Sequence, residues 1–390
     1  MKRALGILGV LCLSVGAARA QDAKATVSQK EIDTAILKGS QYLLTPAPSP
    51  GGHLKGDCDD LILLTLIHAG VSEKSYKEML ERCIGRKLEH TYKVALHAMC
   101  LEELDATKYQ GRIAQCAQFL VDCQASNGQW SYGSPSPAVP SIPFDDKSVA
   151  SGEDKKKKKG EVREFGGGER EHKKPKNAIM IKQTRTVGDK GDNSNSQYAA
   201  LGLRACFDSN VRIPDEVIAR ARKWWEDSQS KDEGGANIDK KAVTTGGDVT
   251  WVRGWNYQNA SQEGAPTHAM TAGAVGATVI YEYMMGRDFK KDNVTKAGVN
   301  WLGKHYSIND NYYYMYALER AGMLYNTELF GGHNWYLEGA RFLVDHQNAN
   351  GSWGHHEGDK KDEDTWDTCF AILFLKKATR AIATEGGSRK

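Results

Sequence analysis

The chain has 390 residues, of which 40% are hydrophobic and 26% charged, and its formal net charge at pH 7 is only +3. This length is enough for one large domain or two ordinary ones. No stretch after residue 20 is apolar enough to cross a membrane as a helix, so we expect no transmembrane segment and leave only peripheral membrane contact open.

The N-terminus has the three parts of a secretory signal peptide. A charged start at residues 1–3 precedes a short apolar run at 4–15 and a small-residue cleavage site at 18–20. This order predicts that residues 1–20 are removed and that the mature protein is secreted or periplasmic. The alternative is a buried N-terminal helix, which the glycines within the run disfavour.

Residues 21–390 have an almost entirely helical pattern. Apolar residues recur at intervals of three and four, as at Ile113, Cys116, Ala117 and Leu120, and long alternating runs are missing. The helices come in six pairs. The first helices of the pairs are expected at residues 30–44, 74–84, 109–123, 215–229, 292–305 and 335–347. The second helices are expected at residues 58–69, 90–104, 194–207, 267–284, 311–325 and 365–378.

The second helices are apolar on several faces, whereas the first helices are amphipathic. Segments 92–96, 197–201, 314–318 and 368–372 align with one another and mix bulky with small apolar residues. A helix that is apolar nearly all round is buried. Six such helices, each with an amphipathic partner, predict an all-α fold with an inner ring inside an outer ring. We expect one domain, an α/α-toroid of six helical hairpins.

The helical pattern stops between residues 131 and 191. Residues 145–192 contain 14 Lys and Arg against 10 Asp and Glu, including a run of five lysines at 155–159. This composition predicts a disordered or extended basic insertion within the third hairpin. A solvated loop is favoured over a tether for nucleic acid or an anionic surface, because acidic residues are interleaved. We therefore expect no nucleic-acid partner.

Two turns between paired helices share the pattern Q-x-x-x-G-x-W. Its copies are Gln124, Gly128 and Trp130 in one turn and Gln347, Gly351 and Trp353 in the other. The glycine can take positive φ after the helix end, and the glutamine can reach backbone groups left unpaired there. The tryptophan can stack over the next hairpin. We interpret all six residues as structural. A weaker copy begins at Gln229 and has no tryptophan at the expected place.

These repeats resemble the QW repeats of squalene–hopene cyclases and of the related prenyltransferase β-subunits. The resemblance covers nearly the whole mature chain outside the insertion. Segments 192–201, 331–335 and 367–375 look like a bacterial group described only as squalene-cyclase-like or prenyltransferase-repeat proteins. The resemblance implies the α/α-toroid fold of terpenoid cyclases. It implies no particular activity, because one fold hosts many functions.

Seven cysteines remain after removal of the signal peptide, so at least one thiol is free or forms an intermolecular bond. No C-x-x-C pair is present, which argues against a thiolate zinc site. Asp367 and Cys369 resemble two zinc ligands of protein prenyltransferases, but no histidine follows Cys369 to complete the set. We therefore predict no metal and no cofactor.

Asp57, Asp59 and Asp60 form a D-x-D-D sequence at the start of a second helix. The motif resembles the acid motif of class II terpene cyclases, and the resemblance makes Asp59 the acid that protonates an alkene. Clustered carboxylates cannot all ionise, so that one of them keeps its proton. The alternative is that these acids only favour the N-terminal end of a helix dipole. Leu61 and Ile62 stand where the cyclase motif continues with Thr-Ala.

In a toroid, the N-terminal ends of the inner helices face one mouth, and polar residues there are candidate ligand contacts. These candidates are His90, Ser196, His268, Tyr312, Tyr313, Asp364 and Asp367. Tyr312 and Tyr316 share one helical face, where they could either line a cavity or pack within the ring. A second, shorter insertion at residues 246–266 carries Trp251, Trp255 and Tyr257 and could lie over a mouth.

These observations favour a protein that binds an apolar, glycan or peptide ligand in the toroid mouth over a catalyst, and the sequence leaves its status as an enzyme undecided. The first alternative is a terpene cyclase of the squalene type with Asp59 as the general acid. A weaker alternative is a periplasmic carbohydrate-active enzyme on an α/α-barrel. It would use two carboxylates from the set Asp59, Asp60, Asp364 and Asp367.

Overall fold

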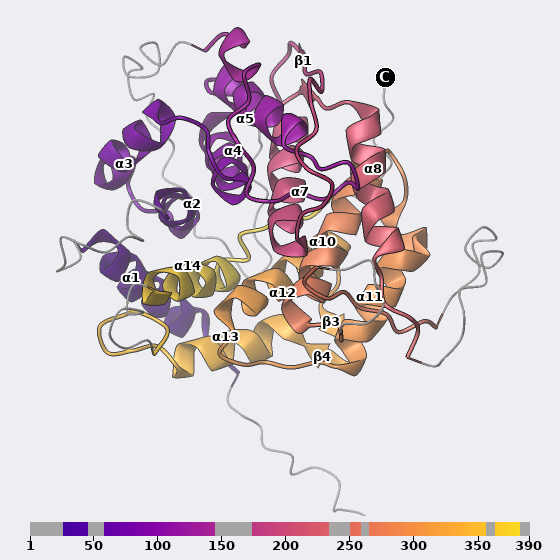
Figure 1. Ribbon diagram of the computed structural model, residues 1–390. Helices are drawn as coiled ribbons and strands as arrows, with labels where there is room; N and C mark the ends of the chain where they lie inside the picture. Colours follow the sequence, from indigo (N-terminus) through magenta and orange to yellow (C-terminus); the bar gives the residue numbers. More distant parts are fainter. Residues whose placement is uncertain are drawn as a thin grey trace, which may run out of the picture.

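The computed structural model describes residues 26–45, 58–144, 174–233, 250–258, 265–355 and 363–382. Within them lie twelve α-helices and only four two-residue strands (Figure 1). The prediction of an all-α chain is therefore confirmed. None of the described helices is both long enough and apolar enough to cross a membrane. The expected signal peptide at residues 1–20 lies outside the described residues.

The helices alternate along the chain between two sets. We call the first set the outer helices: α1 (Gln29–Leu44), α3 (Glu73–Gly85), α5 (Gln110–Asp122), α8 (Asp215–Asp227), α11 (Asn293–Lys304) and α13 (Trp335–Asp345). We call the second set the inner helices: α2 (Asp59–Ala69), α4 (Thr91–Asp105), α7 (Asn193–Asp208), α10 (His268–Met284), α12 (Tyr312–Tyr325) and α14 (Glu363–Leu375). All twelve coincide with predicted helices, and their bounds differ from the prediction by at most three residues.

Short elements connect some of the helices. They are the 3-10 helices η1 (Val139–Ser141) and η2 (Phe289–Lys291) and the strands β1 (Ile179–Met180), β2 (Val211–Arg212), β3 (Leu329–Phe330) and β4 (His333–Asn334). β1 pairs with β2 in parallel, and β3 pairs with β4 in antiparallel orientation. With two residues each, these strands join segments locally and form no sheet that could carry a core.

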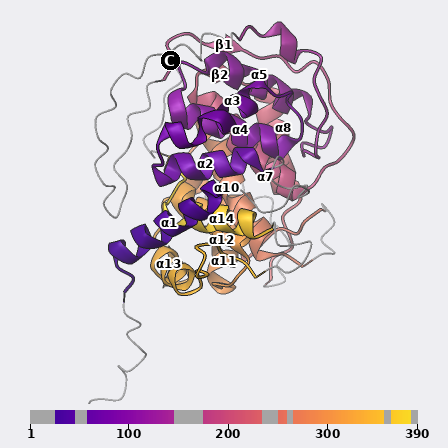
Figure 2. The same cartoon turned by 90° about the vertical axis from the view of Figure 1, so that its left-hand side faces the viewer.

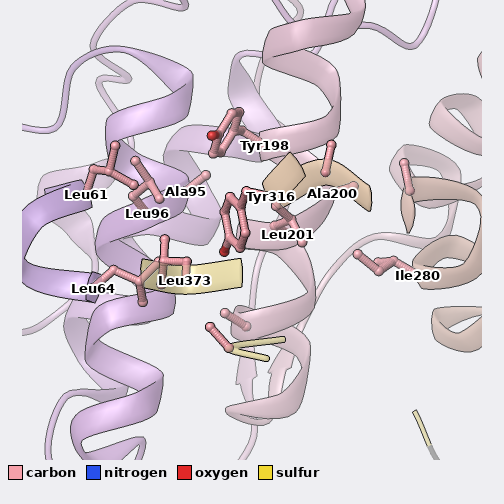
Figure 3. Packing of buried hydrophobic residues seen from close by; sticks show 14 of the residues in the cluster. Leu61, Leu64, Ala95, Leu96, Tyr198, Ala200, Leu201, Ile280, Tyr316 and Leu373 are labelled. Atoms are coloured by element: carbon pink, nitrogen blue, oxygen red, sulfur yellow. The ribbon is translucent and has the colours of Figure 1, made fainter. Parts of the chain in front are cut away.

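The two sets of helices differ in burial as their sequences predict. In α3 the buried residues Tyr76, Leu80, Cys83 and Ile84 follow one another at helical spacing, so that a single face is covered. In α2 every residue from Asp59 to His68 is buried. Figure 3 shows side chains of several inner helices packed together, among them Leu61 from α2 and Leu373 from α14.

The contacts between inner helices form a closed cycle. α2 contacts α4, and the contacts continue through α7, α10, α12 and α14 back to α2. The outer helices lie at the periphery of this cycle (Figure 1). Both views place α1 beside α14, so that the first and last hairpins are neighbours in space (Figure 2). The hydrophobic core therefore lies around and between the inner helices.

The two Q-x-x-x-G-x-W turns have matching geometry. The indole nitrogen of Trp130 donates to the Leu120 carbonyl at 2.7 Å, and that of Trp353 donates to the Leu343 carbonyl at 2.7 Å. Both tryptophans are fully buried. Each indole therefore returns a hydrogen bond to a carbonyl near the end of its own outer helix, where such groups have no partner within the helix.

The glutamine of each turn reaches the following outer helix. The Gln124 amide donates to the Val217 carbonyl of α8 at 2.9 Å, and the Gln347 amide donates to the Ala35 carbonyl of α1 at 2.8 Å. The second of these bonds joins the last hairpin to the first. Gly128 has φ +96°, and a Cβ there would lie 2.3 Å from a backbone oxygen of α8. The turn therefore requires glycine.

A third turn of this kind is complete in the structure, although the sequence suggested that it lacks a tryptophan. The Gln229 amide donates to the Val294 carbonyl of α11 at 2.9 Å. The buried indole of Trp255 donates to the Trp225 carbonyl at 2.8 Å. Trp255, which the sequence placed in an insertion at residues 246–266, instead takes the place of the expected tryptophan, farther along the chain from its glutamine than in the other two turns. Residues 234–249, between Gln229 and Trp255, lie outside the described part.

The flanks of the basic insertion are packed, whereas the sequence predicted a disordered or extended segment over about 131–191. The buried carboxylate of Asp122 accepts hydrogen bonds from Ser136 on one flank and from the backbone and hydroxyl of Thr184 on the other. Ile181 is buried beside them. A few well-placed residues therefore anchor segments whose average composition resembles a disordered chain. Residues 145–173 lie outside the described residues, and their predicted disorder stays a prediction.

Candidate ligand-binding site

The N-terminal ends of α4, α7 and α12 lie near one another at one end of the molecule, which we call the N-terminal mouth. The Thr91 amide at the start of α4 donates to the Tyr132 carbonyl at 2.7 Å, and the Asn193 amide of α7 donates to the Tyr257 carbonyl at 2.9 Å. The hydroxyls of Ser194 in α7 and Tyr313 in α12 are 2.8 Å apart. The loops after the turns therefore cross the helix starts.

Two exposed tyrosines stand at this mouth. The exposed fraction is 60% for Tyr132 and 47% for Tyr257. The Tyr132 ring lies edge-on to the rings of His90 and Tyr92, with centroids 6.1 and 6.3 Å away. His90 was a candidate from the sequence, whereas Tyr92 and Tyr132 were not singled out. The signal for Tyr132 was its place two residues after the turn residue Trp130.

Tyr313, another sequence candidate, belongs to the same mouth. It takes part in a chain of contacts that leads inward, because the Gln197 amide donates to its hydroxyl at 2.6 Å. Burial raises the pKa of Tyr257 at the mouth, and the nearby Asp192 carboxylate acts in the same direction. The tyrosine hydroxyls therefore stay protonated at neutral pH and can both donate and accept hydrogen bonds.

The space between the inner helices is occupied by a buried network. The Arg320 guanidinium donates to the Gln197 side-chain oxygen at 2.7 Å and lies over the rings of Tyr316 and Tyr198. Figure 3 shows Tyr198 and Tyr316 between the leucines of neighbouring helices. The sequence left open whether Tyr316 lines a cavity or packs between the helices, and this arrangement favours packing between the inner helices. A ligand at this mouth would meet the outer edge of the network.

Tyr312, Asp364 and Asp367 form a second corner of the mouth, between α12 and α14. The backbone of Gly354 hydrogen bonds the Tyr312 hydroxyl, and burial raises the pKa of Tyr312 to about 12. A Cβ on Gly354 would lie 2.5 Å from an Asp364 oxygen and 2.8 Å from an Asp367 oxygen. The sequence candidates at this corner are therefore brought together around the turn that follows Trp353.

Two further candidates are engaged in packing. The Ser196 hydroxyl accepts from the Trp130 amide at 2.9 Å and donates to the Asp192 carbonyl at 2.6 Å, so that it fixes the turn. His268 donates from Nε2 to the His305 carbonyl at 2.6 Å. Its ring also lies edge-on to Trp301. These contacts give both side chains a structural explanation.

The acid motif lies at the start of α2 and points toward α3. The Asp59 carboxylate accepts from Arg82 at 3.3 Å. Burial raises the pKa of Asp59, and the Arg82 guanidinium opposes this rise. The Asp60 carboxylate, which is 1% exposed on its side chain, pairs with Arg86. Asp57 lies outside the described residues.

Asp60 also faces a histidine that the sequence did not single out. Nδ1 of the buried His97 in α4 lies 3.3 Å from an Asp60 oxygen. Burial and the nearby Arg112 and Arg86 charges hold the pKa of His97 well below its usual range. The imidazole is therefore neutral at pH 7. The Asp60 cluster ties α2, α3 and α4 together.

The opposite end of the inner helices is crossed by the residues that follow α14. Arg380 pairs with Glu102 of α4 and lies 3.8 Å from Asp208 of α7. Thr379 donates its amide and hydroxyl to the buried Glu319 carboxylate of α12, at 3.0 and 2.7 Å. Residues 376–382, which we call the C-terminal strap, therefore contact α4 and α7 near their C-terminal ends and α12 near its middle.

A hollow of about 380 Å³ lies on the outside of the molecule, between α8, α10 and α11. Its charged walls pair with one another, because Arg222 donates to Glu282 and to Asp292 at 2.6 Å each. The hollow is thus the open side of a structural ion-pair cluster. The described residues contain no group of three or more His, Cys, Asp or Glu side chains that could hold a metal ion. The seven cysteines among the described residues are buried and unbridged.

Comparison with known proteins adds no assignment to this geometry. No protein-family model matches the chain, and the search of curated proteins gives no match.

Proposed function

We propose that this chain is an exported α/α-toroid of the squalene cyclase and prenyltransferase type. The closed cycle of contacts among the six inner helices supports the toroid. The three glutamine–tryptophan turns support it further, because each joins one hairpin to the next. Export rests on the charged start, apolar run and cleavage site at residues 1–20, which point to a secreted or periplasmic protein.

We further propose that the protein binds a ligand at the N-terminal mouth and is not a catalyst. The observation that carries this proposal is the exposure of Tyr132 and Tyr257 at a mouth where the partly buried hydroxyls of Ser194 and Tyr313 lie 2.8 Å apart. Exposed aromatic residues that cluster are typical of binding surfaces. The C-terminal strap lies against α4 and α7 near their other ends, so we expect a ligand to approach from the mouth.

The cyclase interpretation is the second candidate, because burial raises the pKa of Asp59 as an acid catalyst would require. Two observations weigh against it. The Asp59 carboxylate is held by Arg82 of an outer helix, away from the network around Arg320. That network fills the space where an isoprenoid chain would have to fold.

A screen of thermal stability tests the binding proposal. Mature protein would be heated with isoprenoids, oligosaccharides and short peptides, and the compound that raises the melting temperature would be titrated. We expect the variant with both Tyr132→Ala and Tyr257→Ala to lose most of this effect. Tyr325→Ala, at the opposite end of α12, is the matched control and should keep it. An equal effect in all three proteins would contradict a site at this mouth.

A further inference from the structure

Each of the three turns places an aromatic side chain at the mouth, at the same position relative to its tryptophan. The second residue after each turn tryptophan is aromatic: Tyr132 after Trp130, Tyr257 after Trp255 and His355 after Trp353. All three tryptophans are fully buried, whereas Tyr132, Tyr257 and His355 are all exposed. The repeat thus buries one ring as part of the fold and exposes another.

The backbone explains why the exposed rings share one end. After Trp130 the chain crosses the start of α4, where Thr91 donates to the Tyr132 carbonyl. After Trp255 it crosses the start of α7 in the same way, with Asn193 donating to the Tyr257 carbonyl. After Trp353 it meets the Tyr312 hydroxyl at the start of α12. Each exposed ring therefore sits over the inner helix that precedes its own turn.

Hydroxyl groups accompany these rings. The Ser194 hydroxyl bonds to the Tyr313 hydroxyl at 2.8 Å and also interacts with Tyr257, so that three hydroxyls are linked. Around Tyr132 the rings of His90 and Tyr92 stack on each other with centroids 6.0 Å apart. Aromatic faces and hydrogen-bonding hydroxyls thus occur together at the starts of α4, α7 and α12.

We propose that this surface binds a carbohydrate chain, with sugar rings stacked on Tyr132 and Tyr257 and sugar hydroxyls bonded at Ser194 and Tyr313. This rests on the proposed binding function and names its ligand class. A sugar ring has an apolar C–H face and a rim of hydroxyls, which matches tyrosine faces beside hydroxyl edges. An isoprenoid would instead need a deep apolar space, which the Arg320 network occupies among the described residues.

Calorimetric titration of the mature protein with cellohexaose, maltohexaose and the hexamer of N-acetylglucosamine tests this assignment. We expect at least one hexamer to bind, with affinity reduced about tenfold or more in Tyr132→Ala and in Tyr257→Ala. Tyr132→Phe keeps the stacking face and should bind within about threefold of the parent. Tyr325→Ala should bind like the parent. Circular dichroism melts of each variant would show that the fold is kept.

The outcomes separate the ligand class from the site. If no hexamer binds, the carbohydrate assignment is wrong. If none binds but a decamer of proline or dispersed squalene does, and the two alanine variants weaken that binding, then the mouth remains the site for another ligand. If a hexamer binds equally well to the parent and to both alanine variants, both the carbohydrate surface and the proposed site are wrong.

Discussion

The guanidinium carbon of Arg320 lies 4.2 Å from the centroid of the Tyr316 ring, one turn earlier on α12. Arg320 is 2% exposed, and its charge is met by aromatic faces and by the Gln197 side chain. A buried arginine needs such partners, because an isolated charge in the interior is costly. This relationship places a buried charge, with its partners, between the inner helices α7 and α12.

The turn tryptophans should carry a large share of the stability. Trp353→Ala removes a fully buried indole and its bond to the Leu343 carbonyl. We expect a loss of about 3–5 kcal/mol in the free energy of unfolding, measured by urea denaturation. Tyr132→Ala, at an exposed ring, should change this free energy by less than about 0.5 kcal/mol. An unchanged midpoint for Trp353→Ala would refute the structural role.

The packed flanks of the insertion give a second prediction. Asp122→Asn replaces a carboxylate oxygen that accepts from Ser136, Thr184 and Gln118 with an amide that donates. Buried donors then face a donor, which should lower the free energy of unfolding by about 1–3 kcal/mol. Ser136→Ala, which removes one of the donors, should lower the free energy of unfolding by less than Asp122→Asn does. Equal stability of Asp122→Asn and the parent would mean that the flanks are not anchored there.

The helices could be predicted because their signal is local. The spacing of Tyr76, Leu80, Cys83 and Ile84 marks one face of α3 whatever packs against it. Trp255 was missed as a turn residue because an insertion separates it from Gln229, and fixed spacing was the only guide. The flanks 131–144 and 174–191 were misjudged because composition averages over the few anchoring residues, such as Ile181.

The site was predicted only in part, for a related reason. Tyr312, Tyr313, Asp364 and Asp367 lie at the mouth because a residue at the start of an inner helix must be near that end. Whether a side chain is exposed there depends on contacts between hairpins. Ser196 and His268 are thus taken up by the Trp130 amide and the His305 carbonyl, which no pattern within one helix reveals.

The C-terminal strap should make stability depend on pH. Burial raises the pKa of Glu319 from 4.5 to about 7. The hydrogen bonds that Thr379 donates to its carboxylate lower the pKa but do not offset this rise. The neutral form is thus favoured in the folded state, and its stabilising effect is complete below about pH 4.5 and lost as the pH rises through about 7. The difference between the pKa of Glu319 in the folded protein and its ordinary value corresponds to roughly 3 kcal/mol in the free energy of unfolding.

Glu319→Gln tests this dependence, because the amide cannot ionise and can still accept from the Thr379 amide. Melts of parent and variant would be compared at pH 5 and pH 8, where other groups such as His97 contribute equally to both proteins. We expect the variant to gain stability relative to the parent by about 2 kcal/mol between these pH values. A constant difference would show that Glu319 does not titrate in the folded protein.

Asp59→Asn separates binding from cyclisation. We expect no cyclic product when mature protein is incubated with squalene and the extract is analysed. We also expect the variant to unfold within about 1 kcal/mol of the parent, because the partner Arg82 is largely exposed and such pairs contribute little. A cyclic product that forms with the parent and disappears with Asp59→Asn would replace the binding proposal by the cyclase.

The most direct test of the N-terminal mouth is hydrogen–deuterium exchange of the mature protein, with and without the compound that raises its melting temperature most. The account predicts slower exchange at residues 90–93, 131–133 and 255–258, where the exposed rings and the helix starts meet. It predicts no change at the C-terminal strap, residues 376–382. Protection confined to the strap, or to the hollow beside Arg222, would contradict the account.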